Sequence, residues 1–578
     1  MAEIKAQFLK GIGSSDGIAI AKTYLLDKPQ INVDRTKTID NIDEAIKSLE
    51  KTIATTTMQL EKIKDIATEK LGEEKGEIFI AHIGIANDPE MIKEMKALIN
   101  DTKINVPYAI EQVYNKYYEV FRSMEDAYFK ERATDILDIK ERMLCNALGL
   151  TLPDLVSLDT EVVLICHELT PSDTAMLNKK FVKGIISETG GRTSHAAIMS
   201  RSLEIPAVLG VKDILTKVKP NQMVAIDGKE GIVDTNPDLA SWQVRIQEHD
   251  KFVKELQKFV NVKTLTKDNV KVNVEANIGN PVDADWAIKY GCEGIGLYRS
   301  EFLYMGNNQW PTEEEQFIGY KSVLEKIKDE IVVIRTLDIG GDKKLSYYTF
   351  PEEMNPFLGY RAIRFCLANK DIFRTQLRAL GRASVYGKLA IMFPMIATID
   401  EFKQAKSFAL EVFDELRKEG KPVADNIQIG MMVEIPASAA MADKFAKYAD
   451  FFSIGTNDLI QYTMACDRMS KTVSYLYQPN NPALLRMIDM TIKGAHANNK
   501  WVGMCGEMAG DIMSTPLLLG LGLDNFSMSA TSIPNARRII NNLNRKDCEK
   551  LVQEALNLET IDEVNALVKD FLTKQNLI

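Results

Sequence analysis

The chain has 578 residues, of which 45% are hydrophobic and 26% charged, and its formal net charge is -10. This length predicts about three or four domains at roughly 100–200 residues each, and the composition is typical of a soluble globular protein. The negative charge argues against nucleic acid as the main partner. The seven cysteines form no CxxC pair, so neither a zinc site nor a disulfide framework is indicated.

The sequence shows no signal for secretion or for a membrane. Residues 1–22 lack an apolar core flanked by positive charge and a cleavage site, which a signal peptide requires. The apolar run at 516–523 is far shorter than the ~20 residues that span a bilayer. We therefore expect a cytoplasmic protein without membrane insertion.

Helical periodicity follows short β-prone runs in the first 35 residues. Apolar residues recur at intervals of four, three and four, as on one face of an amphipathic helix, at Ile42, Ile46, Leu49 and Ile53. Similar patterns return at 91–98, 108–121 and 136–148. These stretches predict a helical bundle inserted into an α/β domain. Its polar faces are either simply solvated or a docking surface for a partner protein.

A single histidine follows a predicted strand at 182–186. The turn Gly190-Gly191 comes after that strand, and the residues beyond it have a helical pattern that places His195 in the first helical turn. Free backbone N–H groups and the helix dipole favour an anion there. A neutral imidazole at this point can accept a phosphoryl group as a nucleophile. The alternative is a capped helix whose histidine is only structural.

The last 340 residues or so change pattern twice. Apolar residues spaced three and four apart between Leu239 and Leu256 predict a linker helix. Eight short apolar segments then alternate with helical stretches, at 272–276, 294–297, 331–337, 389–395, 427–433, 451–454, 502–504 and 525–528. This alternation favours a closed (β/α)8 barrel. An open doubly wound sheet is the alternative, but no Gly-x-Gly-x-x-Gly turn follows the first strand.

We thus predict a multidomain α/β protein in four parts. The parts are an α/β domain formed by 1–35 and 149–235, an inserted helical bundle at 36–148, a helical linker at 236–262 and a barrel at 263–578.

Charged and polar residues follow many of the predicted barrel strands. In such barrels the active site lies at the carboxyl ends of the strands, where these side chains would meet. They are Arg299, Arg335, Glu434, Asn457, Asp458, Arg468 and Cys505. Arginines bind phosphate and carboxylate groups bidentately, and a glutamate with an aspartate suits Mg²⁺. The pocket therefore fits a small ligand bearing both phosphate and carboxylate. Cys505 is either a buried structural cysteine or a proton-transfer group.

Several long motifs resemble those of the phosphoenolpyruvate-utilising enzymes, and within them the enzyme I branch of the bacterial phosphotransferase system. The resemblance covers nearly the whole chain. Its motifs are Gly190 to His195, Arg335 to Lys343, Asn355 to Arg361, Asp450 to Leu459 and Gly503 to Glu507.

The resemblance implies a specific reaction and partners. Phosphoenolpyruvate would phosphorylate His195 and leave as pyruvate, and the histidine would pass its phosphoryl group to the phosphocarrier protein HPr, docked on the helical insertion. The family dimerises through its barrel. The histidine domain would swing between barrel and bundle about the linker.

The resemblance also implies residue roles. Substrate ligands would be Arg299, Arg335, Asn457, Asp458 and Arg468, with Arg361 as a further pocket arginine. Glu434 and Asp458 would bind Mg²⁺, Cys505 would protonate the enol carbon, and Thr170 would orient His195.

Two other functions fit parts of the pattern. Pyruvate–phosphate dikinases and phosphoenolpyruvate synthases share the swivelling histidine and the barrel, but carry a large nucleotide-grasping domain before the histidine. Only 194 residues precede His195 here, and no P-loop is among them. A catalytically silent scaffold is the second alternative, which the full set of reactive groups disfavours.

Overall fold

The computed structural model forms two compact units, Met1–Val253 and Lys254–Ile578. It describes residues 8–578 apart from 27, 28, 30, 72, 124–126, 154, 156, 157, 171, 172, 175, 192–194, 306, 308, 342, 344, 346, 469 and 471. Over these described residues, no helix is both long enough and apolar enough to cross a membrane.

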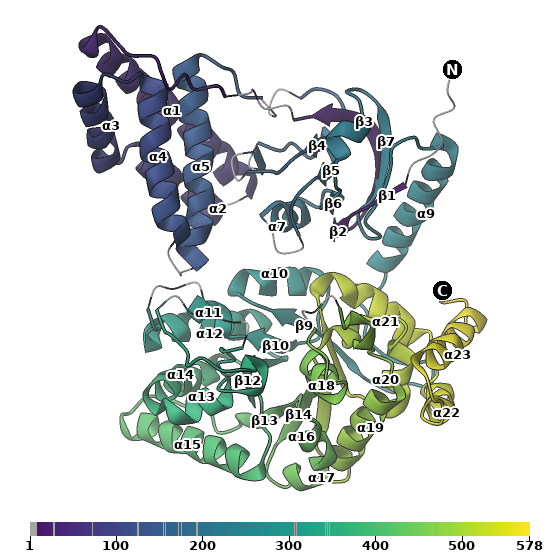
Figure 1. Ribbon diagram of the computed structural model, residues 1–578. Coiled ribbons are helices and arrows are strands. Elements are labelled where there is room, and N and C mark those ends of the chain that lie inside the picture. The colour runs from purple at the N-terminus through teal and green to yellow at the C-terminus, as the bar shows by residue number, and fades with distance from the viewer. Residues whose placement is uncertain are drawn as a thin grey trace. The chain divides into compact units, whose positions relative to one another are not determined.

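An eight-stranded sheet organises the α/β part of the first unit (Figure 1), in the order β1-β8-β7-β3-β4-β5-β6-β2. The strands from β3 to β6 pair in parallel, and the outer pairs are antiparallel. The strands are β1 (Phe8–Lys10), β2 (Ile12–Ser15), β3 (Ile18–Leu25), β4 (Val162–Cys166), β5 (Val182–Ser187), β6 (Ala207–Leu209), β7 (Met223–Asp227) and β8 (Ile232–Asp234). The short helices are α7 (His195–Ser202) and α8 (Ile214–Lys217).

The predicted helical insertion lies between β3 and β4. Its helices are α1 (Ile42–Leu71), α2 (Glu73–Ala86), α3 (Pro89–Thr102), α4 (Val106–Ser123) and α5 (Ala127–Leu148). Leu49, Met95, Ile110 and Met143 are buried in one shared core, which is what the amphipathic pattern requires. Burial of these side chains is the main source of the bundle's stability, because helical propensity alone contributes little.

Helix α9 (Leu239–Gln257) confirms the predicted helix after the α/β part. Its beginning is fixed to the first unit, since Trp242 Nε1 donates to Asp234 Oδ2 at 2.9 Å and Arg245 Nη2 lies 2.9 Å from Asp227 Oδ2. The Arg245 guanidinium also stacks over the Trp242 ring at 4.4 Å. The division between the two units falls inside this helix, after Val253.

Eight parallel strands close into a barrel in the second unit, in the order β10-β11-β12-β13-β14-β15-β16-β9. The (β/α)8 prediction is confirmed, and the open sheet is excluded. The strands are β9 (Asn273–Ile278), β10 (Ile295–Arg299), β11 (Ile331–Arg335), β12 (Lys388–Phe393), β13 (Gln428–Val433), β14 (Phe451–Ile454), β15 (Trp501–Met504) and β16 (Asn525–Met528). All eight predicted segments overlap these strands.

Helices surround the barrel strands, as Figure 1 shows for the green and yellow part of the chain. Capping boxes start three of them, at Thr312, Thr398 and Thr560, each with a glutamate three residues on. The helices are α10 (Pro281–Lys289), α11 (Glu301–Met305), α12 (Glu313–Ile327), α13 (Ile363–Ala368), α14 (Lys370–Ala383), α15 (Ile399–Lys418), α16 (Pro436–Ala440), α17 (Ala442–Phe445), α18 (Thr456–Thr463), α19 (Pro482–His496), α20 (Thr515–Leu521), α21 (Ile533–Asn541), α22 (Arg545–Ala555) and α23 (Ile561–Lys574).

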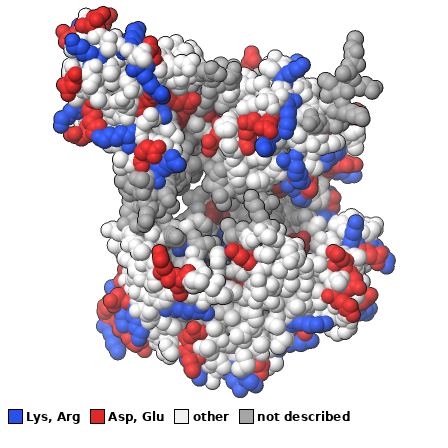
Figure 2. Space-filling model, in the orientation of Figure 1, with Lys and Arg blue, Asp and Glu red and all other residues white. Residues whose placement is uncertain are grey.

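Charge on the visible face is mixed rather than segregated. Figure 2 shows acidic and basic side chains next to one another on both units. On the barrel exterior, the arginines of α14 pair with glutamates of the neighbouring helices, for example Arg378 Nε with Glu313 Oε2 of α12 at 2.7 Å. A surface of this kind gives no continuous basic track on the face in view.

Candidate active site

A cavity of about 550 Å³ opens at the carboxyl ends of the barrel strands. Its wall is formed by residues that follow β10, β11, β14 and β15, because parallel strands of a barrel end at one face. Six of the predicted site residues line it: Arg299, Arg335, Asn457, Asp458, Arg468 and Cys505. Two others, Glu434 and Arg361, are buried behind the lining, and Arg361 contacts the lining residue Asp458. The barrel thus brings together residues from 299 to 505.

Arg335 lies in a buried ion-pair network on one side of the cavity. Its Nη2 contacts a carboxylate oxygen of Glu301 and lies 3.1 Å from Asp338 Oδ2. Lys343 Nζ lies 2.8 Å from the same two carboxylates. Burial works against ionisation of Asp338, but the cations of Arg361, Lys343 and Arg335 hold the pKa of its carboxyl well below the usual value. The network therefore stays charged and rigid at neutral pH.

Sequence reasoning did not select Glu301, Asp338 or Lys343 as site residues, although all three line the cavity. A signal was present for two of them. Glu301 follows Arg299 by two positions and Asp338 follows Arg335 by three, so both come directly after barrel strands.

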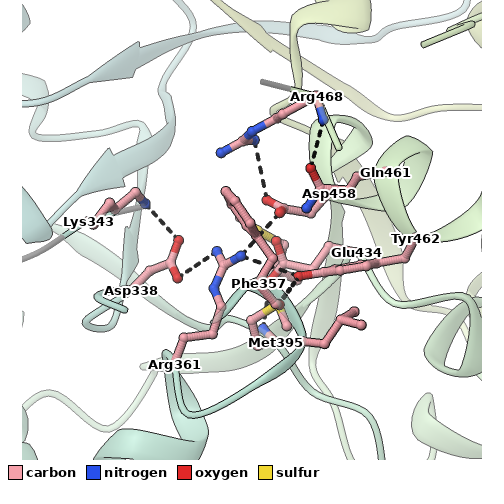
Figure 3. Close-up of polar contacts among 12 residues, drawn as sticks. Asp338, Lys343, Phe357, Arg361, Met395, Glu434, Asp458, Gln461, Tyr462 and Arg468 are labelled. Carbon is pink, nitrogen blue, oxygen red and sulfur yellow. Dashed lines mark hydrogen bonds and ion pairs between the residues drawn. The ribbon is translucent and has the colours of Figure 1, made fainter. Parts of the chain in front are cut away.

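Arg361 is almost completely buried, with 1% of its surface exposed. Figure 3 shows its guanidinium between two carboxylates. Nη2 lies 3.0 Å from Asp338 Oδ1, and Nη1 lies 3.2 Å from Asp458 Oδ1 and 3.3 Å from the Tyr462 hydroxyl oxygen. Gly340 packs against it with φ +100°, where a Cβ would lie 2.7 Å from Arg361 Cβ, so the turn requires glycine. Arg361 therefore links the loops after β11 and β14.

Glu434 and Asp458 form a second acidic group at the ends of neighbouring strands. The strands β13 and β14 pair so that Val433 lies opposite Ile454, which brings the two following loops together. Glu434 Oε1 accepts from the backbone N–H of Met395 at 2.5 Å. Burial, reinforced by the charges of Asp458 and Asp338, raises the pKa of Glu434 to about 7. This local excess of negative charge would be relieved by a bound cation.

Two carboxylates alone do not make a closed metal cage. Among the residues that the structure describes, no group of three or more His, Cys, Asp and Glu side chains is arranged to hold a metal ion. Mg²⁺ nevertheless commonly uses one or two protein carboxylates and completes its shell with water and substrate phosphate oxygens. The pair Glu434 and Asp458 fits that kind of site.

Cys505 lies at the end of β15, with 4% of its surface exposed. Its Sγ is 3.9 Å from the carbonyl oxygen of Ile454. Burial raises the pKa of this thiol above its ordinary value, so the group remains protonated at neutral pH. A protonated thiol on the cavity wall can donate a proton to a bound molecule.

The side-chain amide of Asn457 has a fixed orientation. Its Oδ1 accepts from the Tyr477 hydroxyl at 3.1 Å and from the backbone N–H of Glu507 at 3.4 Å. Since a backbone N–H can only donate, the oxygen must face it, and the NH₂ group is left as a donor elsewhere. Tyr477 also lines the cavity and was not predicted from the sequence.

The predicted phosphoryl acceptor lies in the other unit. Helix α7 begins at His195, after β5 and the turn at Gly190, whose φ is +104°. This confirms the predicted position in the first helical turn. The side chain of His195 and the residues Arg192, Thr193 and Ser194 lie outside the described part of the chain.

Thr170 occupies a turn in the same unit as His195. Its Oγ1 accepts from the backbone N–H of Asp173 at 3.2 Å, and its own N–H donates to Asp173 Oδ2 at 3.1 Å. The hydroxyl proton is not used by either bond, so it can be donated elsewhere. The predicted hydrogen bond from Thr170 to His195 stays a prediction.

Three family models match the chain in succession. The descriptions are "PEP-utilising enzyme, N-terminal" over residues 10–132, "PEP-utilising enzyme, mobile domain" over 158–231, and "PEP-utilising enzyme, PEP-binding domain" over 253–545. The last of these spans the barrel cavity, and the mobile-domain match contains His195.

Curated relatives match over almost the entire length. A phosphoenolpyruvate-protein phosphotransferase of Mycoplasma capricolum is 54% identical over 98% of this chain and 99% of its own. Proteins of the same name from Staphylococcus aureus and Listeria innocua are 52% and 51% identical over 98% of this chain, and over 100% and 99% of their own length. The chain therefore belongs to the phosphoenolpyruvate-utilising enzyme family, alongside the phosphoenolpyruvate-protein phosphotransferases.

Proposed function

We propose that this protein transfers the phosphoryl group of phosphoenolpyruvate to His195, releases pyruvate, and passes the phosphoryl group to a histidine of the phosphocarrier protein HPr. This is the first step of sugar uptake by the phosphotransferase system. The observation that carries the proposal is the barrel cavity, which is lined by guanidinium groups, the Asp458 carboxylate and a protonated thiol, in a chain that such enzymes match over 98% of its length.

The arginines and Asn457 would hold the substrate. Phosphoenolpyruvate carries a phosphate and a carboxylate, and guanidinium groups bind both with two parallel hydrogen bonds. Arg299 and Arg335 reach the cavity from the ends of β10 and β11, and Arg468 from the segment after α18, so they can contact the ligand from several sides. Arg361 would support the substrate-binding residues indirectly, because its guanidinium is already paired with Asp338 and Asp458.

Glu434 and Asp458 would hold Mg²⁺. When bound, the ion would neutralise phosphate charge and stabilise the transferring phosphoryl group electrostatically. Arg468 Nη1 lies 3.7 Å from Asp458 Oδ2, and the guanidinium of Arg361 contacts the other oxygen. These two contacts orient the Asp458 carboxylate.

Cys505 would act as general acid in the reaction. Loss of the phosphoryl group leaves an enolate, whose C3 carbon must gain a proton to become pyruvate. A thiol held in its protonated form supplies that proton without help from solvent. Protonation at carbon makes the phosphoryl transfer hard to reverse.

His195 and the cavity belong to different compact units, so transfer requires α7 and the barrel cavity to meet. We place the hinge in α9, because the division between the units falls inside it and its beginning is fixed by Trp242 and Arg245. HPr would then dock on the insertion α1–α5.

We also propose that the barrels pair in a homodimer in the cytoplasm. Met354 is 96% exposed, and Leu358 and Tyr475 are likewise mostly exposed on the barrel unit. Burying these apolar side chains against a partner would remove them from water, which is favourable.

Purified protein provides the test of the function. With phosphoenolpyruvate, Mg²⁺ and HPr, it should form pyruvate and phosphorylated HPr in equal amounts. Phosphorylation of His195 from ATP instead would show a dikinase-type reaction. Failure to form pyruvate at all would indicate a catalytically silent scaffold.

A further inference from the structure

The first barrel strand, β9, sends polar side chains into the barrel interior. Val274, Ala276 and Ile278 belong to the large core between strands and helices. The intervening residues therefore face the inside, since side chains alternate along a strand. There Glu275 accepts from Asn525 Nδ2 at 2.6 Å, and Asn277 accepts from Ser527 Oγ at 2.7 Å. Both of these donors come from the neighbouring strand β16.

Asn277 also reaches past β16 to the end of β15. Its Nδ2 donates to the backbone carbonyl of Cys505 at 3.0 Å and lies 3.5 Å from the carbonyl of Ser527. Carbonyl oxygens only accept, so the nitrogen of the amide must face Cys505 and its oxygen must face the Ser527 hydroxyl. The amide of Asn277 is thereby fixed in one orientation by three contacts.

The main chain at Cys505 is held on both sides. Its N–H donates to the carbonyl of Ile454 on β14 at 3.1 Å, and its carbonyl accepts from Asn277 of β9. The next residue, Gly506, packs so closely on α18 that a Cβ would lie 1.8 Å from Thr456 Oγ1. With both peptide groups fixed, the position of Sγ depends only on the rotation about χ1.

We infer that Asn277, oriented by Ser527, is a positioning residue that holds Cys505 in place to protonate the substrate carbon. This inference rests on the proposed function, in which Cys505 is the proton donor. Asn277 acts through the Cys505 carbonyl and is absent from the cavity wall, so it touches the reaction only through the thiol. Loss of the Asn277 side chain would leave the carbonyl of Cys505 without this hydrogen-bond donor. The end of β15 would then be free to shift.

Asn277→Ala tests the inference in the full-length protein. A displacement of up to about 1 Å should lower kcat for pyruvate release by roughly 10- to 100-fold. The KM for phosphoenolpyruvate should stay within about threefold, because the proposed ligands are untouched. The rate of Cys505 alkylation by iodoacetamide should also change, read by peptide mass spectrometry with Cys292 as an internal reference.

Two variants separate positioning from general damage to the barrel. Asn273→Ala is the matched control, since Asn273 lies four residues earlier on β9 and its amide donates to Asn525 Oδ1 at 3.2 Å rather than to the Cys505 carbonyl. It should retain kcat and the alkylation rate. Ser527→Ala removes the hydroxyl that orients Asn277 and should give a smaller loss of kcat in the same direction. If Asn277→Ala does not fold, Ser527→Ala alone tests the positioning role of Asn277.

The outcomes are distinguishable from a failure of the proposed function. If Cys505→Ala releases pyruvate normally, the thiol is not the proton donor. Both the proposed role of Cys505 and the positioning role of Asn277 are then wrong. If Cys505→Ala is inactive while Asn277→Ala and Ser527→Ala behave as wild type, only this inference is overturned. Equal losses in Asn273→Ala and Asn277→Ala would likewise overturn it.

Discussion

Replacing Arg361 by methionine should destabilise the barrel strongly, because it removes a cation shared by two carboxylates. The side chain is 1% exposed and lies 3.0 and 3.2 Å from Asp338 and Asp458. Methionine keeps most of the volume but leaves both carboxylates under-compensated. Breaking a buried ion pair in this way costs about 3–5 kcal/mol. For a unit as long as Lys254–Ile578, that free energy corresponds to a Tm lower by about 4–7 °C.

Thermal unfolding of the variant, followed by circular dichroism, measures this effect. Arg364→Met is the matched control, since the half-buried Arg364 guanidinium donates to the carbonyls of Leu358 and Gly359, both at 2.9 Å. It should lose about 1 kcal/mol. In a background with Asp338→Asn, Arg361→Met should cost less by about 0.5–3 kcal/mol, because one of the two carboxylates is then neutral. Equal Tm losses for both arginines, or strict additivity with Asp338→Asn, would refute the reasoning.

Three further changes test the other groups. Glu434→Gln should abolish Mg²⁺-dependent pyruvate formation. Because the pKa of Glu434 is raised from 4.5 to about 7, the free energy of unfolding of the wild type falls as the pH rises through that window, whereas glutamine does not ionise. The variant should therefore be more stable than wild type by about 3 kcal/mol at pH 8 and by little at pH 4.5, and equal Tm differences at the two pH values would count against this reasoning. His195→Ala should form no phosphoprotein yet bind phosphoenolpyruvate in calorimetry, and loss of binding would contradict the separation into two units. Tyr477→Phe removes one of the two hydrogen bonds that orient the Asn457 amide and should raise the KM for phosphoenolpyruvate by roughly 5- to 10-fold, about the free energy of one hydrogen bond. An unchanged KM would count against a role of Asn457 in binding the substrate.

The barrel could be predicted because each of its strands is a short apolar run flanked by helical periodicity. That pattern locates the strands, and the rule that barrel sites lie at carboxyl strand ends then selects Arg299, Arg335 and Cys505. The register could not be predicted, since it depends on pairing between strands as far apart in the sequence as β16 and β9, where Asn525 lies opposite Asn273. His195 was placed correctly in the first turn of its helix because Gly190-Gly191 interrupts the chain just before it.

The contacts between side chains in the site are harder to predict from the sequence than the barrel strands are. Glu301 and Lys343 are 42 positions apart and meet only because β10 and β11 are neighbours. The hydrogen bond from Asn277 to Cys505 spans 228 positions and crosses the strand between them. Because these partners lie so far apart in the sequence, only the folded barrel reveals the contacts between them.

The central claim is that phosphoenolpyruvate phosphorylates His195 in a reaction that depends on the barrel cavity. The most direct test is incubation with phosphoenolpyruvate labelled in its phosphoryl group, with Mg²⁺ and without HPr, followed by peptide mapping of acid-labile phosphate. The account predicts one labelled peptide containing His195 and one pyruvate for each phosphate bound, with no label from ATP. Label on another residue, or label in the His195→Ala variant, would contradict it.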